Sequence, residues 1–372
     1  MVALVIAAAS ICQNKAVGAK SPVSTEIPVE LSPGECIISV PIGSKTFKFE
    51  ISTYELNSYF SKDVKDALAK SNDKENLHIG PDAVAISSLQ VQDLEGEYAG
   101  NGYDGILGMD CLSKIVFGID YQTKKFFVWP ADGPYGWTTA TAPTIVASIS
   151  KDDQWPYVWS SYGWLLFDTS TPDIFAPTAV DSQKDFLNTG LEINLDFMDL
   201  PKEKAELKIA PSFNTQFTQV KAFPVFVSSA FDKDGGYIAP DCMASGFILD
   251  AKNHLLILTP YANGREVFHE IIWNIFGEDT IWKDHQLFLK PSDEDFSKMT
   301  GGKDATIQIV SLNGTKIADL ASSYATNDVK AATMLADVCH GIAEGCNMII
   351  LLNGKEITVR IQMSDDMTAH II

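Results

Sequence analysis

The sequence is poor in positive charge and has few long apolar runs. It contains 28 Lys and Arg residues against 48 Asp and Glu residues, which gives a formal net charge of −20. This balance argues against nucleic acid and anionic membranes as partners, because like charges repel. Beyond the N-terminal segment, no window is long and apolar enough for a transmembrane helix.

Cysteine is also scarce, and its spacing does not indicate a metal site. The chain has 6 cysteines but neither a Cys-x-x-Cys pair nor a His/Cys cluster of metal spacing. The sequence therefore predicts no metal and no cofactor. Cys339 and Cys346 could close a short loop as a disulfide, whereas Cys36, Cys111 and Cys242 are interpreted as buried apolar thiols.

The N-terminus favours export. Residues 1–19 hold an apolar stretch of about ten residues followed by small residues, as a signal peptide does, although a basic start is missing. The sequence thus predicts a secreted protein or one of the periplasm or cell envelope.

An internal repeat gives the strongest indication of the fold. A length of 372 residues exceeds one ordinary domain. Residues 105–130 and 236–260 align with one single-residue gap and share Gly, Asp, Cys, Asp and Pro. Each copy is preceded by short strand-like segments separated by turns, which favours an all-β barrel or sandwich for each copy.

The repeat therefore predicts two pseudo-symmetric β lobes, at residues 25–133 and 141–263, with a cleft between them. Strands are expected at 27–31, 37–41, 46–51, 145–149 and 164–167, and helices at 62–69 and 181–187.

Each predicted lobe carries a polar triplet after an apolar strand. The triplet of the second lobe is Asp168-Thr169-Ser170, and the corresponding place in the first lobe reads Ser52-Thr53-Tyr54. Near its end, the first lobe has the motif Ile106-Leu107-Gly108, and the second has Tyr237-Ile238-Ala239.

These motifs resemble the pepsin/retropepsin-like aspartic peptidase family. In that family each lobe carries an acidic loop near its start and an apolar-apolar-Gly brace near its end. The resemblance implies two β-barrel lobes, Asp168 as a catalytic carboxylate, and a peptide or unfolded protein as substrate or ligand. The first lobe keeps the brace but lacks the aspartate, and the second keeps the aspartate but has Ala239 in its brace.

The missing aspartate leaves the activity open. The reaction needs one ionised and one protonated carboxyl around a water. Ser52 can hydrogen-bond a water but cannot protonate a carbonyl. Glu50 lies about 6–7 Å along the strand from Ser52, too far to share a proton, and Glu55 is a more mobile candidate.

The expected function is a weak or inactive peptidase, a pseudoenzyme that binds peptide in the cleft. One alternative is an active aspartic endopeptidase that combines Asp168 with an unidentified second acid, or with its twin in a dimer. Another is a non-enzymatic surface or assembly protein that uses the C-terminal module at residues 285–363. Independently of these functions, the Asp168 loop could serve only to stabilise the contact between the lobes.

The last third predicts a separate module. Residues 264–284 are expected to form a helical linker, with an amphipathic helix at 265–276. Residues 285–363 resemble a PDZ domain, with residues 331–340 as its groove helix. Residues 309–317 are expected to form a strand-turn-strand segment that ends at Ile317, and residues 348–361 a closing hairpin. The Asn-Gly pairs at 313–314 and 353–354 fit two-residue hairpin turns.

The PDZ resemblance implies a peptide or protein partner beside the groove helix. The family's Gly-rich carboxylate-binding loop has no counterpart here, so a packing module without a ligand is the alternative. Asn313-Gly314-Thr315 also matches a glycosylation acceptor, but the turn explains it better.

Overall fold

The protein is mostly β. The computed structural model describes residues 24–32, 34–95, 100–130, 145–148, 155–160, 163–171, 174–177, 186–194, 203–214, 219–232, 235–259, 280–283, 286–289, 307–326, 328–363 and 369–371. The predicted signal peptide and the predicted helix at 265–276 lie outside these ranges. None of the helices within them is long and apolar enough to cross a membrane.

The chain divides into two compact units. The first comprises Met1–Val158, Leu166–Pro172 and Tyr237–Ala262, and the second comprises Trp159–Leu165, Asp173–Gly236 and Asn263–Ile372. The predicted second lobe thus contributes to both units. Both polar triplets belong to the first unit.

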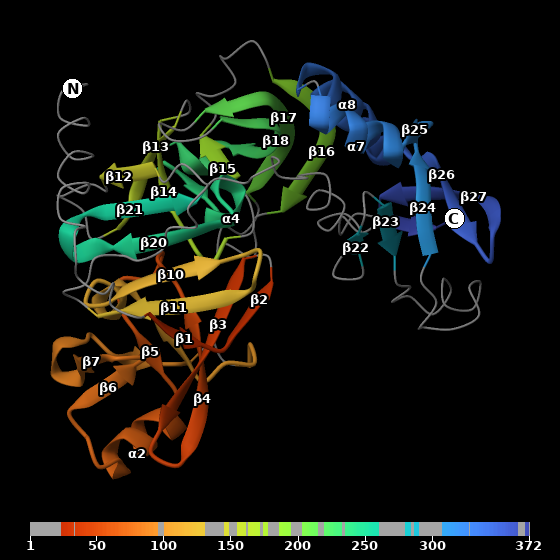
Figure 1. Ribbon diagram of the computed structural model, residues 1–372. Coiled ribbons are helices and arrows are strands. Elements are labelled where there is room, and N and C mark those ends of the chain that lie inside the picture. The colour runs from red at the N-terminus through yellow and green to blue at the C-terminus, as the bar shows by residue number, and fades with distance from the viewer. Residues whose placement is uncertain are drawn as a thin grey trace, which may run out of the picture. The chain divides into compact units, whose positions relative to one another are not determined.

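The repeat forms the centre of one antiparallel sheet in the first unit. Its strand order is β1 (Thr25–Ile27), β11 (Lys125–Trp129), β10 (Val116–Asp120), β20 (Gly246–Asp250), β21 (Leu255–Thr259) and β12 (Ile145–Ser148). In the adjacent strands β10 and β20 (Figure 1), Gly118 pairs with Ile248, its own counterpart in the repeat. The two copies are therefore related by a local twofold axis at this pair, and the duplication is present in the structure.

Aromatic side chains fill the core around this axis. Phe117 and its repeat counterpart Phe247 meet edge to face, with ring centroids 5.8 Å apart. Phe247 also meets Phe167 at 4.9 Å. All three are fully buried, and Phe167 directly precedes Asp168. The packed rings thus fix the strand that carries the acidic loop.

The cysteines follow the same symmetry. Cys111 lies in α3 (Met109–Leu112) and Cys242 in α4 (Pro240–Met243), at equivalent places, and both are buried. Cys36 is buried as well, which confirms the interpretation of these three as apolar thiols. Cys339 and Cys346 are both free, so the disulfide considered for them is not formed.

A second sheet of the first unit positions the Ser52 loop. Its order is β2 (Val29–Ser32), β3 (Glu35–Ile42), β4 (Lys45–Ile51), β9 (Gly105–Leu107), β5 (Tyr59–Phe60) and β8 (Gln92–Asp93). Strand β9 runs between β4 and β5, which are consecutive in the sequence. The segment that joins β4 to β5, residues 52–58, must therefore cross the end of β9.

The smaller elements of the first unit complete this arrangement. Helix α2 (Lys62–Lys70) confirms the helix predicted at 62–69, and its N-cap Ser61 accepts a hydrogen bond from the Val64 amide. Strands β6 (Asn76–Ile79) and β7 (Asp82–Ala85) form a separate hairpin.

The second copy repeats the crossing. β19 (Gly236–Ile238) lies between β14 (Gly163–Phe167) and β15 (Ile174–Pro177), so the Asp168 loop crosses the end of β19. A methyl group on Gly236 would overlap the Phe175 carbonyl, as one on Gly105 would overlap the Tyr59 carbonyl in the first copy. The sheet continues through β18 (Gln219–Ser228), β17 (Lys204–Asn214) and β16 (Leu187–Asn194), and β13 (Tyr157–Ser160) lies beside β14 at the other end.

Two predicted helical segments need correction. Leu187 begins strand β16, so the helix expected at 181–187 does not reach its predicted end, and residues 181–185 lie outside the described ranges. The predicted linker at 264–284 ends in a strand, β22 (Thr280–Lys283). The predicted helical pattern covers only residues 265–276 and does not extend to this strand.

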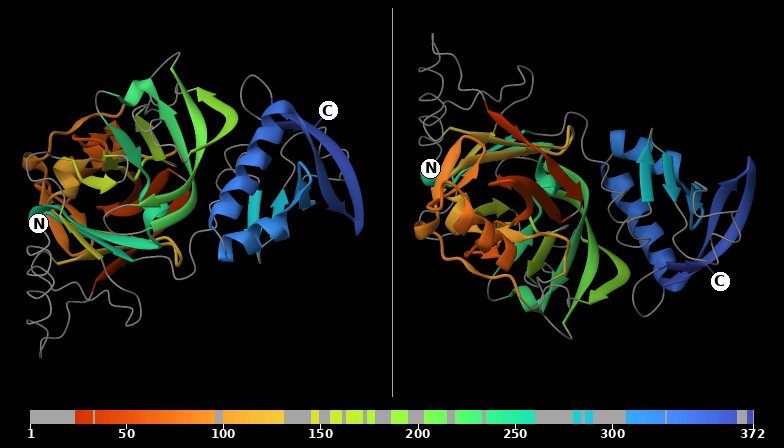
Figure 2. Two further views of the ribbon diagram at one scale, coloured as in Figure 1. Left: turned by 90° about the horizontal axis from the view of Figure 1, so that it is seen from above. Right: turned by 90° about the horizontal axis from the view of Figure 1, so that it is seen from below.

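The C-terminal module is an antiparallel sheet with a helix pair. Its strand order is β22, β23 (Gln286–Leu289), β24 (Ile307–Leu312), β26 (Cys346–Leu352), β27 (Lys355–Met363) and β28 (Ala369–Ile371), and the short β25 (Thr315–Lys316) pairs with β24. Helices α7 (Ile317–Thr326) and α8 (Asp328–Glu344) pack against this sheet (Figure 2).

Both predicted Asn-Gly turns are present in this module. Asn313 and Gly314 have φ values of 48° and 79°, and Asn353 and Gly354 have φ values of 51° and 76°. Positive φ at both central residues is the type I′ geometry. The groove-helix segment lies in α8, but Ile317, predicted as a strand end, begins α7.

The brace glycine gives a direct test of the crossing geometry. A methyl group on Gly108 would overlap the Asn57 carbonyl and come within 2.8 Å of the Glu55 carbonyl. We expect Gly108→Ala to lower the free energy of unfolding by about 3 kcal/mol or more, because the neighbouring atoms are backbone. Urea denaturation would measure this loss.

The second copy supplies the matched control. Ala239 occupies the position equivalent to Gly108 and is fully buried. Ala239→Gly should cost only about 1–2 kcal/mol, from added chain entropy and one lost methyl. Equal losses for the two variants would contradict the brace geometry.

Candidate functional site

The two polar triplets occupy equivalent backbone positions in the first unit. The Ser52 amide donates to the Leu107 carbonyl at 3.2 Å, and the Asp168 amide donates to the Ile238 carbonyl at 3.1 Å. Each loop is thereby hydrogen-bonded to the middle residue of the brace in its own copy. The predicted bracing residues Ile106, Leu107, Gly108, Ile238 and Ala239 are all buried.

The two loops are joined by a reciprocal threonine network. The Thr53 amide donates to the Thr169 hydroxyl at 3.1 Å, and the Thr169 amide donates to the Thr53 hydroxyl at 3.1 Å. Each hydroxyl then donates at 2.6 Å to the opposite strand: Thr53 to the Phe167 carbonyl and Thr169 to the Ile51 carbonyl. Four buried hydrogen bonds therefore hold the loops face to face.

A chain of hydroxyl groups leads from Ser52 to Asp168. The Ser170 amide and hydroxyl both donate to Oδ1 of Asp168, at 2.8 and 2.6 Å. The Ser52 and Ser170 hydroxyl oxygens lie 3.1 Å apart. Because Ser170 gives its proton to the carboxylate, Ser52 is the donor in this contact. The amide of Glu55 in turn donates to Ser52 Oγ at 3.2 Å.

Asp168 is a buried acid with a strongly perturbed titration. Burial raises its pKa from 3.8 to about 6, against the lowering effect of the two Ser170 hydrogen bonds, and the charge of Glu55 raises it further. Asp168 is only 4% exposed. A carboxyl that changes its charge near pH 6 suits general acid or base chemistry.

Glu50 is a second acid with a raised pKa. Burial raises its pKa from 4.5 to about 7, a hydrogen bond from Tyr103 opposes the shift, and the charges of Glu35, Asp168 and Glu55 add to it. Sequence reasoning treated Glu50 only as too distant to share a proton. It missed Tyr103, which lies 53 residues further along the chain, and the electrostatic coupling to Asp168.

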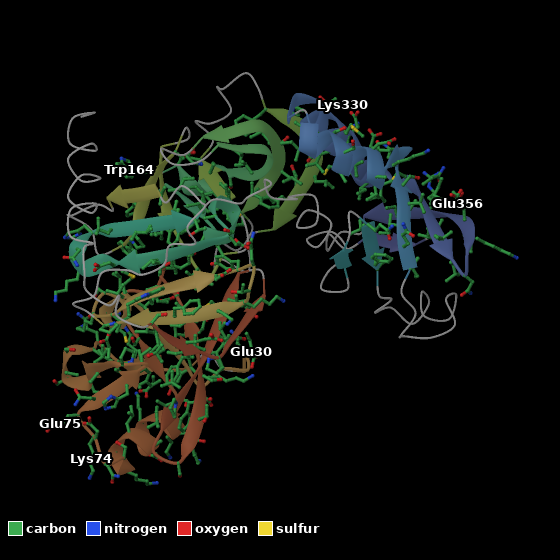
Figure 3. All side chains as sticks on the ribbon, viewed as in Figure 1. Glu30, Lys74, Glu75, Trp164, Lys330 and Glu356 are labelled. Carbon is green, nitrogen blue, oxygen red and sulfur yellow. The ribbon has the colours of Figure 1, made fainter. Side chains whose placement is uncertain are left out.

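Aromatic groups lie beside the Ser52 loop. The Tyr54 ring meets the Tyr237 ring edge to face, with centroids 5.7 Å apart. The indole N–H of Trp155 donates to the Tyr54 carbonyl at 2.7 Å. Tyr54 is 43% exposed, and with Trp164 (Figure 3) it is one of two exposed large apolar side chains among the described residues. We call Tyr54 and Tyr237 the aromatic rim.

The site thus has an ionisable carboxyl, Asp168, on one loop and a neutral hydroxyl, Ser52, at the equivalent position of the other loop. Ser52 and Asp168 can orient a water or a carbonyl by hydrogen bonds. Ser52 cannot act as the second acid, because its hydroxyl does not titrate in the useful range. In the described part of the chain, no three His, Cys, Asp or Glu side chains gather in a way that could hold a metal ion.

No protein-family model matches the chain, and a search of curated proteins finds no significant match. The family resemblance therefore rests on the loops, the braces and the repeat.

The threonine network generates a stability prediction. Thr53→Val replaces the hydroxyl by a methyl of similar size and leaves the Thr169 amide and the Phe167 carbonyl buried without this partner. We expect a loss of about 2–4 kcal/mol in the free energy of unfolding, measured by urea denaturation. Thr53→Ser keeps the oxygen and should lose clearly less. A Val variant as stable as the Ser variant would refute the role of the hydroxyl.

Glu50 generates a prediction about pH. A folded-state pKa above the unfolded value means that the folded protein binds the proton more tightly, so stability falls as pH rises from about 4.5 to about 7. Glu50→Gln should remove the part of this fall that Glu50 causes and leave the part that Asp168 causes. We expect the variant to be more stable than the natural protein by about 3 kcal/mol near pH 8 and equally stable near pH 4.

Thermal and urea unfolding across this pH range would measure the effect. Glu75→Gln, which changes an exposed carboxyl of the same unit, is the control and should leave the pH profile unchanged. An unchanged profile for Glu50→Gln would show that burial of Glu50 is not the cause.

Proposed function

We propose that this chain is an aspartic-peptidase-like protein that binds peptide or unfolded protein at the Ser52 and Asp168 loops and hydrolyses it weakly or not at all. The observation that carries the proposal is the reciprocal bonding of Thr53 and Thr169. This network sets two loops of related sequence face to face, which is the arrangement a paired-carboxyl peptidase needs. The two-barrel description of the lobes belongs to the same proposal.

The absence of efficient hydrolysis follows from the chemistry of Ser52. A paired-carboxyl site relies on two acids whose proximity separates their pKa values. Here Ser52 Oγ contacts Ser170 Oγ at 3.1 Å, and Oδ1 of Asp168 accepts hydrogen bonds from Ser170. The loop geometry is therefore kept while one of the two carboxyls is replaced.

An active peptidase is the second candidate, and the titration of Glu50 favours it. The pKa of Asp168 is raised to about 6 and that of Glu50 to about 7, and the charge of Asp168 contributes to the shift of Glu50. In this version Glu50 acts as the second acid through its electrostatic coupling to Asp168, because it lies too far along the strand from Ser52 to share a proton directly. Glu50→Gln and Asp168→Asn should then each abolish proteolysis, whereas the binding proposal expects little proteolysis to lose.

For the C-terminal module we propose a PDZ-like domain that contacts a peptide or protein partner. Two type I′ Asn-Gly turns and the helix α8 between them support this assignment. The expected export of the chain is likewise a proposal. Dependence of assembly on residues 280–363 would support a non-enzymatic assembly role instead.

Repair of the site tests the proposed function. Ser52→Asp with Tyr54→Gly should restore a paired-aspartate site, because the first change supplies the missing carboxyl and the second gives the loop a small residue, as Ser170 is in the second loop. The double variant should cleave an unfolded protein at mildly acidic pH, where one of two coupled carboxyls stays protonated. It should also bind a transition-state-like inhibitor more tightly than the natural protein does.

The controls separate lost chemistry from a lost scaffold. The double variant carrying Asp168→Asn in addition should be inactive, and circular dichroism should show that every variant is folded. Cleavage by the natural protein at the rate of the repaired variant would contradict the proposal. A folded repaired variant that neither cleaves nor binds the inhibitor would show that the site differs from a peptidase site by more than one carboxyl, and it would favour a purely binding role.

A further inference from the structure

The aromatic rim presents an exposed ring at a fixed position. Tyr54 is 43% exposed, yet its ring packs on Tyr237 and its carbonyl accepts a hydrogen bond from Trp155. These contacts belong to the first unit, as do Ser52 and Asp168. A side chain held in this way loses little conformational entropy when a ligand packs on it.

Tyr54 is followed in the sequence by an acidic residue, Glu55, whose charge raises the pKa of the Asp168 carboxyl. The charged groups that shift the pKa of Glu50 are carboxyls as well, those of Glu35, Asp168 and Glu55. Among the described residues, these charge effects include none from Lys, Arg or His.

We propose that the peptide bound at this site carries a lysine or arginine side chain, which lies against the Tyr54 ring and near the carboxylates of Glu55 and Asp168. The proposal rests on the proposed function and specifies its ligand. A cation is attracted by the face of an aromatic ring. The alkyl stem of such a side chain packs on apolar surface while its charged end reaches the half-buried Glu55, and the charge of the buried Asp168 attracts it from further away.

The same features argue against the other ligand classes. An acidic side chain would be repelled by the carboxyls of Glu55 and Asp168. A neutral apolar side chain could pack on Tyr54 but would gain nothing from Glu55 or Asp168. The net charge of −20 further favours a basic partner over an acidic one during encounter.

The test compares three unfolded peptides that differ at one central position, which is lysine, norleucine or glutamate. Binding to the full chain is measured by fluorescence anisotropy with a label at the peptide terminus, in low salt at neutral pH. We expect the norleucine peptide to bind about tenfold more weakly than the lysine peptide, since the cation–ring contact and the ion pairing are lost. The glutamate peptide should bind more weakly still.

Variants locate the preference at the rim. Tyr54→Ala and Glu55→Gln should each reduce the preference for lysine over norleucine several-fold. Tyr54→Phe keeps the ring and should retain most of it. Glu75→Gln removes an equal charge from an exposed position of the same unit, labelled in Figure 3, and should leave the preference unchanged.

The outcomes separate the two proposals. Equal affinity for the lysine and norleucine peptides would overturn the basic-ligand inference and leave peptide binding intact. A lysine preference that survives both Tyr54→Ala and Glu55→Gln would also overturn it, because the cation would then lie elsewhere. If the folded protein bound none of the three peptides, the proposed function itself would fail.

Discussion

The reciprocal bonding of Thr53 and Thr169 is the constraint on which the site depends. Each threonine supplies one amide and one hydroxyl to the other loop or its strand, so all four groups are satisfied in a buried place. A buried donor or acceptor left unpaired costs about 1–3 kcal/mol, so neither loop can shift without losing several such bonds. Residues 116 positions apart in the sequence are thereby held in register.

These hydrogen bonds involve only backbone groups and the two threonine hydroxyls. They therefore do not constrain the side chains on either side of each threonine. The threonines are the same in both triplets, whereas Ser52 corresponds to Asp168 and Tyr54 to Ser170. The pairing of β10 with β20 is likewise symmetric, although the counterparts Gly118 and Ile248 have very different side chains. The two copies therefore share a scaffold and differ in the groups that a ligand would meet.

Much of this scaffold could be predicted from the sequence, because its signals are local. The repeat was visible in fixed spacings, and the Asn-Gly pairs at 313–314 and 353–354 specify their turns by backbone conformation alone. Helix α7 was not predicted, since Ile317 reads as the end of a strand. The contacts of Tyr54 with Tyr237 and of Glu50 with Tyr103 join distant segments, and no local pattern encodes them.

Burial of the charged Asp168 carboxylate costs free energy, and a pair of catalytic carboxyls would reduce this cost. In a pair, one carboxyl stays protonated and donates to the other, so a single charge is shared. Asp168 instead relies on Ser170 for its hydrogen bonds, and burial still raises its pKa to about 6. At neutral pH the folded protein therefore holds an ionised carboxyl at a position that favours the neutral form. Any ligand group that brings positive charge to this place relieves the cost, so ionisation of Asp168 and binding of a cation must favour one another.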